Sequence, residues 1–146
     1  MAVPENERSG NKLQVLNLSA QLLHYTYAKT QKPKSKIDPK EGGCFPRSAL
    51  RLANQIWDLC YYGDSCLNMA NDYIVHTLAD YKVRRKLQLK GRGYIMHLPR
   101  LLMLAFSENL ISAKNLDFWC KIVYETLDLA GKWIESDEKR YKDIGC

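Results

Sequence analysis

Residues 116–134, with the sequence LDFWCKIVYETLDLAGKWI, carry the clearest periodic pattern in this chain. Their apolar side chains recur at spacings of three and four residues, which is typical of one face of an α-helix. The main row consists of Leu116, Trp119, Cys120, Val123, Leu127, Ala130 and Ile134. A second row beside it consists of Phe118, Ile122, Leu129 and Trp133. This pattern predicts a long helix with a broad buried face, followed beyond Ser136 by a charged, solvated end.

Four further helical patterns precede this segment. The first covers residues 12–27, after a polar stretch over residues 1–10 that we expect to be a flexible tail. The second opens near residues 46–48, and the third follows it directly. The fourth, over residues 99–107, starts with a proline, which suits the first turn of a helix. Because the fourth is apolar on all sides, we expect it to be buried.

Glycines set two of the predicted helix boundaries. Gly63 is predicted to close the second helix, and Asp64 or Ser65 to cap the third. The glycines at residues 91–93 are predicted to end the third helix in a turn. An alternative is that these glycines form a flexible hinge that lets Arg92 approach a phosphate closely.

The whole pattern predicts an all-α protein, a single compact bundle of about five helices over residues 11–146. Within it, residues 30–46 hold lysines, prolines and glycines that cannot continue a helix, so a basic surface loop is expected there. No segment shows the sustained alternation of a half-buried strand. A chain of 146 residues can bury a core without metal or disulfide bonds.

The cysteines indicate a reducing environment. Their number is odd and their spacing irregular: Cys44, Cys60, Cys66, Cys120 and Cys146. Three of them fall within apolar helical patterns, where a thiol acts as a small hydrophobic side chain. No secretory signal precedes them, and the longest apolar run, residues 101–106, is too short to span a membrane. We therefore expect no disulfides and a location in the cytosol or nucleus.

Catalytic and metal-binding patterns are not recognisable in this sequence. The three histidines, His24, His76 and His97, are scattered and match no metal-ligand spacing. Cys120 could be a nucleophile, but its place on the apolar row predicts a buried, inert thiol. We therefore predict a protein that is not an enzyme and that holds no metal or other cofactor.

The positive charge is concentrated in the first part of the chain. The net charge is +6, with 16 basic and 8 acidic residues in residues 1–100 against 6 and 8 in residues 101–146. The main cluster consists of Lys82, Arg84, Arg85, Lys86, Lys90 and Arg92. A second cluster consists of Lys32, Lys34, Lys36, Arg47 and Arg51. Tyr81 and Tyr94 flank the main cluster, where their rings could stack on unpaired bases.

These clusters favour binding of RNA or another single-stranded nucleic acid, largely independent of sequence, through phosphate contacts. The alternative is a protein-interaction adaptor or a homo-oligomerising structural protein. In that case the basic residues serve solubility or an acidic protein partner, and exposed members of the tryptophan and tyrosine set favour self-association. Both types occur among small basic helical proteins, including viral nucleic-acid-associated proteins and cellular adaptors. What separates the two is whether both basic clusters share one continuous face.

Overall fold

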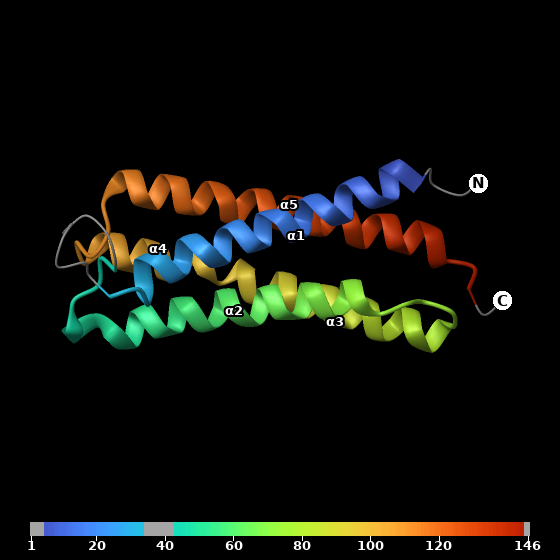
Figure 1. Cartoon of the computed structure of the whole chain (residues 1–146), viewed down its shortest axis with the longest axis horizontal. Coiled ribbons are helices and arrows are strands. Elements are labelled where there is room, and N and C mark those ends of the chain that lie inside the picture. Colours follow the sequence, from blue (N-terminus) through green and yellow to red (C-terminus); the bar gives the residue numbers. More distant parts are fainter. Residues whose placement is uncertain (1–4, 34–42, 145–146) are drawn as a thin grey trace.

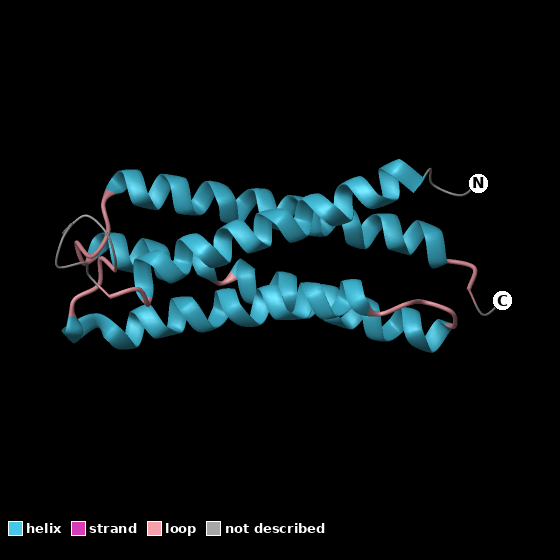
Figure 2. Cartoon of the chain, viewed as in Figure 1, coloured by secondary structure: helices cyan, strands magenta, loops and turns pink. Residues whose placement is uncertain are grey.

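The chain folds into five α-helices, as a computed structural model shows for the backbone of residues 5–33 and 43–144 and the side chains of 14–33 and 43–144 (Figure 1). The helices are α1 (Glu5–Thr30), α2 (Leu50–Asp72), α3 (Leu78–Met96), α4 (Leu98–Ser107) and α5 (Ala113–Tyr141). A single 3-10 turn, Arg47–Ala49, precedes α2. The described ranges contain no strand (Figure 2), which confirms the predicted all-α bundle.

The four long helices form an antiparallel bundle. Helices α1, α2, α3 and α5 alternate in direction, and the short α4 lies in the connection between α3 and α5 (Figure 1). Helix α1 packs against α2 and α5, and α3 packs against the same two helices. This arrangement places the beginning of α3 beside the end of α5, at the end of the bundle where α1 begins (Figure 1).

The core follows the predicted apolar row of α5. Trp119, Val123 and Ala130 are buried, and together with Leu22 and Ile56 they belong to one apolar cluster. The indole Nε1 of Trp119 donates a hydrogen bond of 3.0 Å to the Thr26 hydroxyl. Because a buried polar group without a partner costs free energy, this bond lets the tryptophan fill the core completely.

Helix α1 begins earlier than predicted. Residues 5–10, expected to belong to a flexible tail, are helical, while residues 1–4 lie outside the described part of the chain. One glycine, Gly10, lowers helix stability by only about 1 kcal/mol. The absence of apolar periodicity over these residues was therefore a poor guide to their conformation.

The predicted boundaries at Gly63 and at residues 91–93 are wrong, because α2 and α3 continue through these glycines. A Cβ atom on Gly63 would lie 2.6 Å from Cγ1 of Ile95, and one on Gly91 would lie 3.0 Å from the carbonyl oxygen of Gly63. The two glycines therefore allow α2 and α3 to pack closely. Asp64, predicted as a cap, lies within α2 and accepts a 2.7 Å hydrogen bond from Ser19 on α1.

The chain instead reverses between Asp72 and Leu78. Thr77 caps α3: its hydroxyl accepts a 3.2 Å hydrogen bond from the Asp80 backbone N–H, and the Asp80 carboxylate accepts one of 3.0 Å from the Thr77 backbone N–H. The carboxylate also accepts a hydrogen bond from the backbone N–H of His76, and these N–H donors lower the pKa of Asp80. This reciprocal capping fixes where α3 begins.

Two other segments differ from their predicted burial. Helix α4 buries Leu98, Leu102 and Ala105 but exposes Met103 and Leu104, so it is not enclosed on all sides. A ten-residue helix that lies on the surface of a bundle can cover only one of its faces. The charged end of α5 is also not fully solvated, because Asp137 is completely buried.

In the described part of the chain, the predicted burial is confirmed for Cys60 and Cys66 but not for Cys120. Cys60 and Cys66 are buried and Cys120 is half-buried, and none of these residues forms a disulfide. Burial raises the pKa of the Cys60 thiol to about 12, which keeps it protonated. Cys146 lies outside the described residues. Among the described helices, none combines the length and apolar character that a membrane crossing requires.

Candidate nucleic-acid interface

Lys82, Lys86 and Lys90 form an exposed row along α3. They are spaced four residues apart, so they follow one side of the helix over about 12 Å. The stretch from Tyr81 to Ser107 contains no acidic residue, and these lysines therefore have no acidic neighbour on their own helix beyond Asp80. We call this row the α3 lysine row.

Arg84 does not belong to the surface, contrary to the sequence prediction. Its Nε donates a 2.7 Å hydrogen bond to Oδ2 of Asp137, and its Nη2 donates one of 3.2 Å to Oδ1. Gln88 donates a further 2.8 Å bond to the same carboxylate, and the guanidinium lies 5.3 Å from the ring centre of Trp133. Both ions are buried, so this bidentate pair joins α3 to α5 and cannot bind a phosphate.

Arg92 also has a structural role. Its Nε donates a 3.1 Å hydrogen bond to the carbonyl oxygen of Leu127 on α5. The guanidinium crosses Gly131, where an added Cβ would lie 3.7 Å from this same nitrogen. This distance is an ordinary van der Waals contact, so the arginine packs over Gly131 without needing a glycine there. The proposed hinge at Arg92 is therefore wrong, since this residue lies within α3 and is attached to α5.

A hollow of about 470 Å³ lies between the beginning of α3 and the end of α5. Its lining consists of Leu78, Tyr81, Lys82, Arg85, Glu138, Tyr141 and Lys142. We call it the α3–α5 hollow. It contains three cations and one anion, and Glu138 and Arg85 pair with each other at 3.7 Å, which leaves Lys82 and Lys142 as its other two cations.

Two tyrosines give this hollow an aromatic wall. The rings of Tyr81 and Tyr141 lie 5.3 Å apart between centres and are inclined at 40°. Tyr81 is largely buried and Tyr141 is half-buried, and the guanidinium of Arg140 lies 5.7 Å from the centre of the Tyr141 ring. Tyr94, the other predicted stacking residue, packs instead against Tyr62 of α2 at 5.8 Å. Only one of the two predicted aromatic residues therefore reaches the basic hollow.

Tyr141 and Lys142 are site residues that sequence reasoning missed. They lie 60 or so positions from Lys82 in the chain, and the acidic residues around them suggested a neutral surface. The signal that could have found them is the length of α5. A helix that continues to Tyr141 and runs antiparallel to α3 must bring its last turn beside the first turn of α3.

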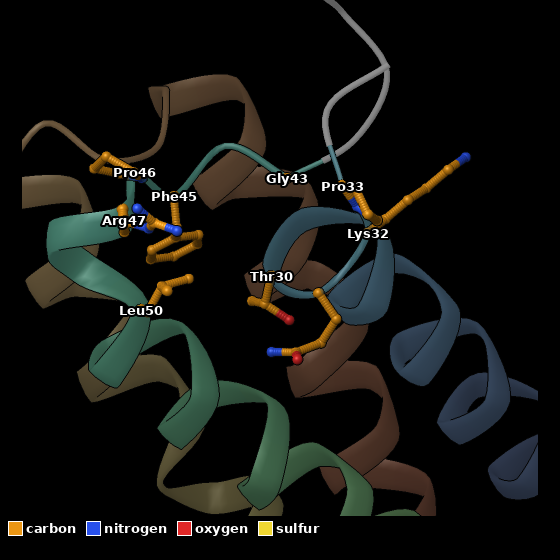
Figure 3. Close-up of a pocket in the computed structure, with 9 residues that line it drawn as sticks. Thr30, Lys32, Pro33, Gly43, Phe45, Pro46, Arg47 and Leu50 are labelled. Carbon is orange, nitrogen blue, oxygen red and sulfur yellow. The ribbon is translucent and has the colours of Figure 1, made fainter. Parts of the chain in front are cut away.

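The second basic cluster lies at the opposite end of the bundle. Lys32 and Arg47 line a hollow of about 300 Å³ between the end of α1 and the beginning of α2 (Figure 3). The side chain of Lys32 extends away from this hollow (Figure 3), and Arg51 is exposed on α2. Lys34 and Lys36 lie outside the described residues.

The fold separates the two clusters. Tyr62 of α2 and Tyr94 of α3 are in contact, and from them Arg51 and Lys82 lie in opposite directions along the bundle. The helical rise places these two residues roughly 35 Å apart. Figure 1 accordingly shows the beginning of α2 and the beginning of α3 at opposite ends. The clusters therefore do not form one continuous face. A shared face would have favoured nucleic-acid binding over the adaptor or structural alternative, and the described part of the chain does not provide one.

Comparisons with protein-family models, with curated proteins and with solved structures found no match for this chain. In its described part, no group of three or more histidine, cysteine, aspartate or glutamate residues could hold a metal ion.

Proposed function

We propose that the protein binds single-stranded nucleic acid, most readily RNA, through the α3 lysine row and the α3–α5 hollow. The observation that carries this proposal is the combination in one hollow of Lys82, Arg85 and Lys142 with the ring of Tyr141. Cations beside an aromatic ring are the two elements with which proteins hold an unpaired strand. The proposal is for a binding protein and includes no catalytic step.

We propose different roles for the two parts of this interface. Lys82 belongs to both parts, because it lines the hollow and begins the lysine row. Phosphates would lie along Lys82, Lys86 and Lys90, and a base would stack on Tyr141 at the end of the row. The contacts would be to backbone and ring faces, so little preference for sequence is expected.

The second cluster is not part of this interface, because it lies at the far end of the bundle. A long strand could still contact Lys32, Arg47 and Arg51 without a defined path between the two ends. A variant that replaces these three residues by alanine therefore tests whether binding is localised. Equal losses from both ends would indicate unspecific charge attraction instead of a site.

The decisive experiment is a salt titration of binding to a labelled oligouridine, measured by fluorescence anisotropy. The variant K82A/K86A/K90A should reduce the slope of log affinity against log salt by about 2, because each lost phosphate contact contributes about 0.7 for a single strand. These side chains are exposed, so the fold should be retained. The matched control K114A/K121A/K132A removes three exposed lysines of α5 and should leave the slope nearly unchanged.

Two results would contradict the proposal. If the wild type does not bind RNA or single-stranded DNA at low salt, the alternative of an adaptor or structural protein stands. If the α3 and α5 triple variants lose affinity equally, the lysine row is not a site.

We also propose a reducing location, the cytosol or the nucleus. Cys60 and Cys66 support it, because they are buried thiols that form no disulfide.

A further inference from the structure

The outer face of α4 is apolar and uncovered. Met103 is 53% exposed and Leu104 is 45% exposed, and Met96, at the end of α3, is 50% exposed. The opposite face of α4, with Leu98, Leu102 and Ala105, packs into the bundle. This outer face lies apart from the α3–α5 hollow, and its role does not depend on nucleic-acid binding.

One basic and one acidic residue, Arg100 and Glu108, lie at equal distances along α4 from Leu104, which is at the centre of this face. Arg100 precedes Leu104 by four residues, and Glu108 follows it by four, so the three exposed residues form one row along the helix. Arg100 is the only charged residue within α4, and Glu108 is its C-terminal capping residue. In the described part of the chain, neither residue forms an ion pair.

We propose that this face binds a second copy of the same chain, with the two α4 helices antiparallel about a twofold axis at Leu104. A twofold axis pairs each residue with its counterpart at the same distance on the other side of the centre. Leu104 therefore meets Leu104 of the second copy, and Arg100 meets Glu108 twice. The antiparallel helix dipoles also place each arginine beside the negative end of the other helix.

The charge pattern is self-complementary, so a second copy fits this face without a partner that has its own matched charges. An acidic partner would be repelled by Glu108, and a basic one by Arg100, whereas the antiparallel copy satisfies both charges at once. The area is limited, since a ten-residue helix is only about 15 Å long. Stable interfaces bury about 800 Å² on each partner. The dimer should therefore be weak and depend on concentration.

A charge exchange tests this arrangement. Sedimentation velocity of the full chain from about 1 to 500 μM should show a monomer–dimer equilibrium. R100E and E108R should each weaken the dimer by about tenfold, because each places two pairs of like charges together. The double variant R100E/E108R should restore the dimerisation constant to within about threefold of wild type. Circular dichroism of each variant confirms that the fold is retained.

Two outcomes would overturn the inference. One is a wild type that stays monomeric over the whole range, and the other is a double variant that dimerises no better than either single variant. L104Q should also abolish dimerisation, whereas the control L89Q, on an exposed leucine of α3, should not. RNA affinity of L104Q should stay within twofold of wild type, so failure of the dimer and failure of RNA binding are distinguishable.

Discussion

Replacing Gly63 by alanine should destabilise the protein, although the same change normally stabilises a helix. Gly63 lies inside α2, where alanine is favoured over glycine by about 0.5–1 kcal/mol. The new Cβ would lie 2.6 Å from Cγ1 of Ile95 and 3.2 Å from the carbonyl oxygen of Gly91. Ile95 is buried, and β-branched side chains in helices have little freedom to rotate. The two helices must therefore move apart.

Gly93 provides the matched control. It lies within α3, two residues from Gly91, and a Cβ added there has no neighbour within 4 Å. Gly93→Ala should therefore stabilise the protein by about 0.5–1 kcal/mol. Overpacking of a close contact costs about 1–3 kcal/mol, so Gly63→Ala should show a net loss of about 1–2 kcal/mol. The difference between the two variants isolates the cost of separating α2 from α3.

Urea denaturation followed by circular dichroism measures both effects. With a slope near 2 kcal/mol/M, the two midpoints should differ by about 1 M urea or more. A double-mutant cycle identifies the main contact. In an Ile95→Ala background the 2.6 Å contact is absent and only the 3.2 Å contact with the Gly91 carbonyl oxygen remains, so Gly63→Ala should destabilise the protein much less. The reasoning fails if Gly63→Ala is as stable as Gly93→Ala in the wild-type background.

Two further predictions concern buried groups. Asp137→Ala should lower the free energy of unfolding by about 3–5 kcal/mol, because it leaves the Arg84 cation buried without its partner. The double variant Arg84→Met/Asp137→Leu, which removes both charges, should lose much less stability. Equal thermal stability of the single and the double variant would contradict this prediction. Cys60 should resist iodoacetamide at pH 8 in the native protein and react in urea, because burial raises its pKa to about 12. Mass spectrometry of the labelled peptide measures this, and rapid native labelling would refute it.

The sequence by itself determined the helical class and the buried face of α5. The main row from Leu116 to Ile134 lies in the core except for the half-buried Cys120, because periodic burial leaves a local signature that needs no knowledge of the partner helix. The second row was predicted less well, since Phe118 is 44% exposed. Pro99 likewise marked the first turn of α4 correctly. Lys82, Lys86 and Lys90 are exposed, as predicted for the whole basic cluster, but the same prediction was wrong for the buried Arg84.

Only the tertiary structure decided which basic residues and which glycines lie in the contacts between helices. Arg84 pairs with Asp137 from a helix 53 positions away, and Gly63 faces Ile95 across the contact of α2 with α3. Tyr141 and Lys142 joined the candidate site only through the antiparallel register of α3 and α5. The physical reason is that a glycine or an arginine has the same local sequence whether it faces solvent or a neighbouring helix. Its role depends on which distant residue the fold places opposite to it.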